Sequence, residues 1–280
     1  MANALTDPAR TYTATIVAIC PADRSEETKS ALRGLHTRTG VRPIVVTLGD
    51  RAEPPLNEEA GAIVIDGLTP RYLNNVVAAR RLSSLPAIAW WRGGDPSVLD
   101  GLAALVDRLV MDSIDPRQDW AAALPLLDVT AFADLRWTRL TRWRNLMAQF
   151  FDVPAIRTAA EGFSRLEVVA GDASTAQLFA GWLSARLPSG PRLEVATQNA
   201  SGPHAMVSAT LSGPVHRLEL RLTPNGTCVH SSIDGGSLPT AARTVSLGDQ
   251  SPASLLEEEL RIRARDTGFE QALRFAAGVL

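Results

Sequence analysis

Apolar runs and polar helical segments alternate through the first half of the chain. Predominantly apolar runs occur at residues 12–20, 43–48, 62–65, 86–91 and 109–111, and the first of them is also rich in β-branched residues. Such runs are typical of strands buried on both faces of a parallel sheet. Between them, the pattern predicts helices with recognisable ends: one over 23–39 that stops at Gly40, and one over 70–82. The alternation predicts an α/β domain with a mostly parallel sheet.

The pattern changes after residue 152. A strand at 165–170 and an apolar helix at 175–187 are followed by strands with no helix between them. The clearest pair is 216–223 and 227–232, joined through Asn225-Gly226, which is a strong signal for a tight hairpin turn. These features predict an α+β domain with antiparallel strands.

The last helical pattern covers residues 255–265, and we expect its glutamates to form a solvated side: Glu257, Glu258 and Glu259. We therefore expect two domains. An α/β domain covers residues 1–152, and a smaller α+β domain covers residues 153–280.

Two segments combine tryptophan with arginine. In the first, Asp134 caps a predicted helix in which Trp137, Leu140, Trp143 and Phe150 recur at helical spacing, among arginines at 136, 139, 142 and 144. The second segment, WWRGGDP at 90–96, leads from a predicted strand into a predicted helix start. Trp and Arg are enriched at binding hot spots, although a core helix with a solvated basic face explains the spacing equally well.

These segments supply our candidate partner-binding residues. Trp137 and Trp143 lie about 120° apart around an ideal helix, so one can anchor the helix while the other faces a partner. The candidates are Trp90, Trp91, Arg92, Gly93, Gly94, Asp95, Trp137, Arg139, Trp143 and Arg144.

The turn at residues 92–96 also allows a different interpretation. Open parallel sheets bind ligands beyond the carboxyl ends of their strands, and Arg92-Gly93-Gly94 before a helix start suits an anion such as a sugar phosphate. The segment matches neither the dinucleotide fingerprint nor the phosphate loop, and Asp95 as a cap would occupy the N–H groups that an anion needs. An anion site is therefore the alternative hypothesis here.

Composition excludes several classes of function. The chain has 280 residues, 45% of them apolar and 21% charged, with a formal net charge of −2, so we expect no nucleic-acid partner. No apolar run approaches the ~20 residues of a membrane span, and no signal pattern occurs, so we expect a cytoplasmic protein without a membrane contact. Cys20 and Cys228 cannot form a disulfide framework.

No catalytic constellation is recognisable. The four histidines, at 36, 204, 216 and 230, lack the spacing of a metal site, and we expect neither a metal nor a cofactor. Cys228 and His230 lie two residues apart on a predicted strand, with no third group identifiable. The sequence therefore predicts a protein that is not an enzyme, with an uncharacterised enzyme on an α/β scaffold as the less favoured hypothesis.

The two tryptophan segments carry a family resemblance. LPAIAWWRGGDP at 85–96 and DLRWTRLTRWR at 134–144, with SLLEEELR at 254–261 as positional support, are similar to the OpcA family of glucose-6-phosphate dehydrogenase assembly proteins. The resemblance implies a non-catalytic allosteric activator that binds glucose-6-phosphate dehydrogenase, aids its assembly and supports the oxidative pentose phosphate pathway. Some members of the family are under redox control, but two cysteines far apart argue against a thiol switch in this chain. The alternative is a phosphometabolite-sensing module with its anion site near Arg92-Gly93-Gly94.

Overall fold

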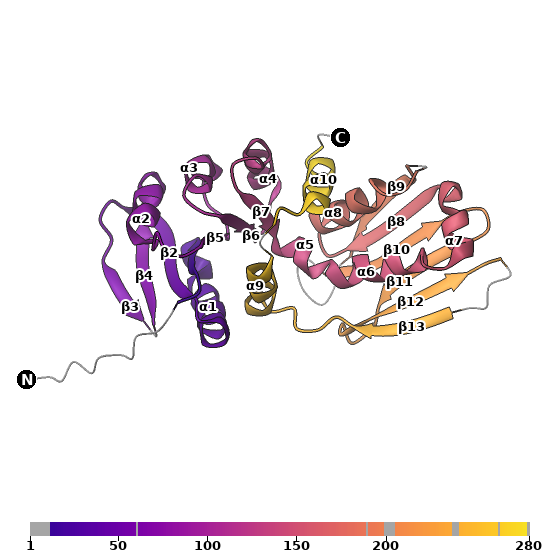
Figure 1. Cartoon of the computed structure of the whole chain (residues 1–280), viewed down its shortest axis with the longest axis horizontal. Helices are drawn as coiled ribbons and strands as arrows, with labels where there is room; N and C mark the ends of the chain where they lie inside the picture. Colours follow the sequence, from indigo (N-terminus) through magenta and orange to yellow (C-terminus); the bar gives the residue numbers. More distant parts are fainter. Residues whose placement is uncertain are drawn as a thin grey trace, which may run out of the picture. The chain divides into compact units, whose positions relative to one another are not determined.

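The computed structural model describes residues 12–59, 61–188, 190–198, 205–236, 241–262 and 264–278 (Figure 1). The chain forms two compact units, and each is assembled from two stretches of sequence. The first unit comprises Met1–Ala133 with Ser251–Arg265, and the second comprises Asp134–Gln250 with Asp266–Leu280.

The first unit contains a seven-stranded sheet in the order β3-β4-β2-β1-β5-β6-β7. Its strands are β1 (Thr15–Cys20), β2 (Arg42–Arg51), β3 (Leu56–Glu59), β4 (Ala62–Leu68), β5 (Ala87–Trp91), β6 (Arg108–Met111) and β7 (Ala131–Asp134). The neighbouring strands β4, β2, β1, β5 and β6 are parallel, whereas β3 runs antiparallel to β4. Every residue of β1 and β5 is buried, as expected for parallel strands covered on both faces.

Helices cover both faces of this sheet. They are α1 (Ser25–Thr39), α2 (Leu73–Arg80), α3 (Leu99–Ala103), α4 (Arg117–Ala123) and α9 (Pro252–Arg261), with short 3₁₀ turns at Ala22–Arg24, Pro70–Tyr72, Pro96–Val98 and Leu124–Leu126. The helix α1 packs against α9, while α3 contacts both α2 and α4 (Figure 1). As predicted, α1 ends at Gly40, which adopts the left-handed conformation with φ 69°.

The second unit contains a six-stranded sheet in the order β13-β12-β11-β10-β8-β9. Its strands are β8 (Arg165–Ala170), β9 (Arg192–Thr197), β10 (Met206–Ser212), β11 (Arg217–Leu222), β12 (Cys228–Asp234) and β13 (Ala241–Ser246). All neighbours are antiparallel except β8 and β9. The predicted hairpin joins β11 to β12, and Gly226 takes a positive φ of 70° in its turn.

The core of the second unit lies beneath its helices. These are α5 (Leu135–Arg139), α6 (Thr141–Phe150), α7 (Pro154–Thr158), α8 (Ala173–Ser184) and α10 (Thr267–Ala276), with a 3₁₀ turn at Ala160–Gly162. In sheet register, Ile233, Leu218, Leu211 and Leu166 form one buried row across four strands. This row results from the alternation of apolar and charged residues along the strands.

The predicted fold class is confirmed: a mostly parallel α/β unit is accompanied by an α+β unit with mostly antiparallel strands. The division of the chain differs from the expected ranges of 1–152 and 153–280. The helix α6 contacts β11 and β12, so the tryptophan segment at 134–150 belongs to the second unit. The helix α9 returns to the first unit, where it packs on α1.

Several local features differ from the sequence expectation. The single helix expected from Asp134 to Phe150 is two helices, α5 and α6, with Leu140 between them. The patterns also did not predict β3, β7 or α10. The expectation that the glutamates of α9 are all solvated is wrong for Glu259, which is 3% exposed because it pairs with Arg108.

Among the residues described, each helix is too short or too polar to pass through a bilayer.

Candidate functional site

The carboxyl edge of the first unit's sheet carries a small cavity of about 250 Å³. It lies where β1, β5 and β6 end next to one another, and Arg92, Gly93 and Gly94 contribute to its lining. Arg92 directly follows β5, and Asp112 directly follows β6. This is the position at which open parallel sheets bind ligands.

Each of the three nitrogens of the Arg92 guanidinium donates to a side chain of its own unit. Its Nε donates to Asp112 Oδ2 at 3.2 Å, its Nη1 to Thr28 Oγ1 at 2.7 Å and its Nη2 to Glu27 Oε1 at 2.8 Å. The group also lies 4.5 Å from the centroid of the Trp90 ring. Arg92 is only 1% exposed, so its charge is neutralised in place and is not available to an incoming anion.

A second arginine closes the same network. Arg24 Nη1 donates to the carbonyl oxygens of Arg92 and Asp112 at 3.0 and 2.8 Å. Burial, followed by the positive charge of Arg92, lowers the pKa of Arg24 from its ordinary value. Two cations and the carboxylates of Glu27 and Asp112 therefore hold the ends of β5 and β6 together.

The glycine turn has a backbone conformation that residues with a side chain rarely adopt. Gly93 and Gly94 have φ values of 121° and 150°. A Cβ atom on Gly94 would lie 2.3 Å from Leu48 Cδ1 and 2.9 Å from Trp91 Cη2. Asp95 then accepts the backbone N–H of Ser97 at 3.0 Å, and this hydrogen bond lowers the pKa of Asp95. The turn therefore lies against Leu48 and Trp91, and Asp95 accepts the Ser97 N–H group as expected for a helix cap.

The residues after β1 do not fit a dinucleotide. A dinucleotide needs glycines in the first strand-to-helix turn, so that its pyrophosphate can approach the helix N-terminus. Here the turn is Pro21-Ala22-Asp23, where the proline has no N–H and the aspartate adds a negative charge. The first turn of α1 carries Glu26 and Glu27. A pyrophosphate would therefore meet carboxylates instead of free N–H donors.

The second tryptophan segment forms part of the interior of the second unit. Trp137 Nε1 donates to Asp266 Oδ2 at 2.7 Å, and Asp266 Oδ1 accepts the backbone N–H of Phe269 as the cap of α10. The guanidinium carbon of Arg144 lies 3.4 Å from the Trp137 ring centroid. This stacked group joins α5 and α6 to α10, since Trp137 also contacts the ring of Phe269.

The structure places the sequence candidates in two groups, with residues 90–95 in the first unit and residues 137–144 in the second. Five of the ten are buried: Trp90, Trp91, Arg92, Trp137 and Trp143. Buried side chains cannot themselves form a contact surface in this structure. Gly94 and Asp95 are exposed, whereas Gly93, Arg139 and Arg144 are half-buried. Partner binding stays a prediction for all ten candidates, the buried ones as residues that support a contact surface.

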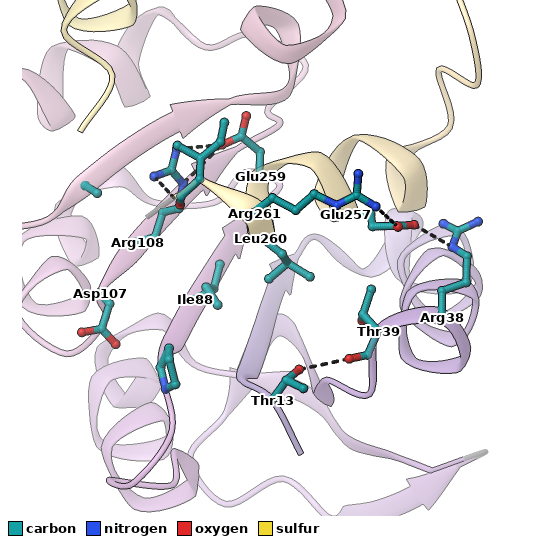
Figure 2. A pocket seen from close by; sticks show the side chains of 13 residues that line it. Thr13, Arg38, Thr39, Ile88, Asp107, Arg108, Glu257, Glu259, Leu260 and Arg261 are labelled. Atoms are coloured by element: carbon teal, nitrogen blue, oxygen red, sulfur yellow. Dashed lines mark hydrogen bonds and ion pairs between the residues drawn. The ribbon is translucent and has the colours of Figure 1, made fainter. Parts of the chain in front are cut away.

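Sequence reasoning missed a larger cavity of about 520 Å³ at the opposite, amino edge of the same sheet (Figure 2). The segments that line it are far apart in the sequence: Arg108 and Glu259, for example, are separated by 151 positions. The amphipathic pattern of residues 255–265 was the one signal in the sequence, and it did not reveal which element this helix covers.

The remaining reactive groups form no recognisable site. Among the described residues, no group of three or more His, Cys, Asp and Glu side chains could hold a metal ion; His204 lies outside that range. Cys20 is buried, and burial raises the pKa of its thiol despite a hydrogen bond with Thr28. Cys228 is half-buried and His230 is exposed on β12.

Comparison with known proteins identifies the family. The OpcA family model, which describes the C-terminal domain of a glucose-6-phosphate dehydrogenase subunit, matches residues 130–273, slightly more than half of the chain. A curated relative from Nostoc punctiforme, described as an OxPP cycle protein OpcA, is 26% identical over 253 residues, covering 74% of this chain and 54% of the relative. Another from Synechocystis with the same description is 28% identical over 124 residues, covering 41% of this chain and 26% of the relative. The chain thus spans about half the length of the first relative.

Solved structures with a similar fold are oxidoreductases. A 3-ketoreductase from Actinomadura kijaniata, in complex with TDP-benzene and NADP, has a TM-score of 0.56 at 12% identity and covers 95% of both chains. An aldose–aldose oxidoreductase from Caulobacter crescentus has a TM-score of 0.53 at 12% identity, again covering 95% of both. At these identities the likeness establishes the fold and not the chemistry.

Proposed function

Since the chain belongs to the OpcA family of glucose-6-phosphate dehydrogenase subunits, we propose that it binds glucose-6-phosphate dehydrogenase, aids the assembly of its oligomer and raises its activity. In this proposal the protein catalyses no reaction itself and acts in the cytoplasm, without a membrane or nucleic-acid contact. Its place is the oxidative pentose phosphate pathway. The observation that carries the proposal is the family match over residues 130–273, which spans most of the second unit together with α9.

The carboxyl edge of the first unit supports a non-catalytic role. The related fold carries a cofactor in the Actinomadura enzyme, whose structure holds NADP. In this chain the Arg92–Glu27–Asp112 network occupies the carboxyl edge of the parallel sheet, and the turn after β1 has no glycine. Hydride transfer to or from a nicotinamide needs that cofactor to bind, and these residues do not fit one.

The same network weighs against a phosphometabolite sensor centred on Arg92-Gly93-Gly94. Every nitrogen of the Arg92 guanidinium already donates to a side chain of the first unit. A sugar phosphate would have to displace Glu27 or Asp112 from a buried cation. We therefore expect glucose 6-phosphate alone to leave the melting temperature of the isolated chain unchanged, because a ligand that binds the native state would raise it.

Co-purification followed by kinetics tests the proposal. The tagged chain is used to capture the host's glucose-6-phosphate dehydrogenase, and NADPH formation is then followed with and without the chain. We expect a stable complex and a higher kcat or a lower KM. Sedimentation velocity separates assembly from allosteric activation, since only assembly changes the oligomer distribution of the dehydrogenase. A chain that forms no complex, or that reduces NADP⁺ unaided, would contradict the proposal.

A pair of variants tests the surface contacts in the second unit. Arg139 is a half-buried candidate, while Arg142 is exposed three positions away and is not a candidate. We expect Arg139→Glu to weaken activation at least fivefold and Arg142→Glu to leave it within twofold. Equal losses in the two variants would show that charge alone matters, and no loss in either would show that Arg139 makes no contact with the dehydrogenase.

A further inference from the structure

The cavity of about 520 Å³ at the amino edge of the first unit's sheet has an apolar floor (Figure 2). Ile88 of β5 and Leu260 of α9 point into it, and Ile262, just after α9, also lines it. Ile262 is 40% exposed although it is a large apolar residue. Covering the apolar surface of a cavity with an apolar group is favourable, by roughly 25 cal/mol for each Å² removed from water.

Ion pairs surround this floor. On one side, Glu257 accepts from Arg38 at 3.1 Å and from Arg261 at 2.6 Å. On the other side, Glu259 accepts from Arg108 at 2.8 Å. Figure 2 shows the two groups on opposite sides of Leu260.

The charges of the lining cancel. Three arginines face three carboxylates, the third of which is Asp107, whose Oδ2 accepts the backbone N–H of Ala87 at 2.8 Å. An anion would have to displace a carboxylate from its arginine, and a cation would meet as many arginines as carboxylates. The lining therefore favours an occupant that is uncharged and apolar where it enters the cavity.

An apolar centre surrounded by a rim of paired polar groups is typical of a protein–protein interface. In such contacts one apolar anchor fills a pocket while the surrounding polar residues exclude water. Small-molecule sites differ, because a few polar groups with open hydrogen-bonding capacity converge on the ligand. Here ion pairs join five of the six charged lining residues to one another, and the sixth, Asp107, accepts a backbone N–H group.

The position of the cavity along the chain links it to the family. Leu260 and Ile262 lie within residues 130–273, the stretch matched by the family model, although α9 completes the first unit. We propose that this cavity receives an apolar side chain, of the size of leucine, methionine or phenylalanine, from glucose-6-phosphate dehydrogenase. The inference rests on the proposed function and names the contact that it would use.

Ile262→Glu tests the inference, because it places a carboxylate at the apolar floor. Leu82→Glu is the matched control, since Leu82 is 38% exposed in the same unit and does not line the cavity. The dissociation constant for glucose-6-phosphate dehydrogenase is measured by biolayer interferometry on the full chain. We expect Ile262→Glu to weaken binding at least tenfold, while Leu82→Glu and Ile262→Leu stay within twofold. Equal melting temperatures of the variants would establish that the fold is intact.

The possible failures can be told apart. If the wild-type chain does not bind the dehydrogenase, the proposed function fails and this inference fails with it. If wild type binds and Ile262→Glu binds within twofold of it, the cavity is not the contact and only this inference is overturned. If the isolated chain self-associates and Ile262→Glu makes it monomeric, the occupant is a second copy and the inference is again overturned.

Discussion

The buried ion pair between Arg108 and Glu259 gives a quantitative test of how α9 is held in the first unit. The two side chains are 7% and 3% exposed. Glu259 Oε2 accepts from both Nε and Nη2 of Arg108, at 3.2 and 2.8 Å. The Nη1 of Arg108 donates to the carbonyl oxygens of Ile262 and Ala264, both at 3.3 Å. One guanidinium group therefore binds both the helix and the segment that follows it.

Replacing Glu259 with leucine removes the only carboxylate that the structure places on this guanidinium among the described residues. A buried charge without its partner costs about 3–5 kcal/mol of unfolding free energy. Glu259→Gln keeps an acceptor oxygen but loses the negative charge, so we expect a loss of about 1–3 kcal/mol. The double variant Arg108→Met/Glu259→Leu replaces the pair with apolar groups and is expected to stay within about 1 kcal/mol of wild type.

Urea unfolding followed by circular dichroism measures these differences through the midpoint, provided that the slope m is unchanged. Glu258→Gln is the control, because Glu258 is exposed on the same helix and its replacement should stay within about 0.5 kcal/mol. If Glu259→Leu unfolds at the same urea concentration as Glu258→Gln, the pair contributes nothing and our account of α9 is wrong.

Three further variants or treatments have defined outcomes. Gly94→Ala should lose about 1–3 kcal/mol from its backbone conformation alone, and more through overlap with Leu48; an unchanged urea midpoint would contradict this. Asp266→Ala removes a helix cap and the acceptor for the Trp137 indole, so we expect a loss of about 2–4 kcal/mol, and a wild-type melting curve would argue against both roles. Because Cys20 is buried and its pKa is raised, its thiol stays protonated at pH 8, so in a Cys228→Ser variant Ellman's reagent should react only after unfolding; rapid reaction of that variant in its native state would count against this.

The sequence predicted the elements with strong local patterns. The strand β1 is a continuous apolar run, and the hairpin turn at Asn225-Gly226 has a specific backbone requirement, so both could be recognised without a structure. The strand β3 could not be recognised, because all four of its residues are exposed and no apolar alternation marks it. A sequence pattern therefore predicts an element only where neighbouring residues in the sequence themselves show its burial or its turn conformation.

Contacts between distant positions explain what could not be predicted. Glu27 and Arg92 are 65 positions apart, and the sequence around each residue does not indicate that it pairs with the other. The enrichment of Trp and Arg at hot spots led us to expect a contact surface at Trp137, but the same residue types form stacked, hydrogen-bonded interiors. The contacts of Trp137 with Arg144 and Asp266 place its ring in the interior and not on a contact surface. Asp266 is 129 positions from Trp137, so the sequence around Trp137 does not show this contact.

The discontinuous first unit has a consequence for the order of events during synthesis. A ribosome makes α9 only after every strand of both sheets, because Ser251 follows them all. Until then Arg108 has no carboxylate from Glu259, and the side of α1 that α9 covers remains open to water. Domains generally fold as they emerge, the N-terminal one first. In this chain the first unit is completed only after most of the second has been translated, so one side of α1 stays uncovered, and accessible to chaperones, from the synthesis of α1 until that of α9.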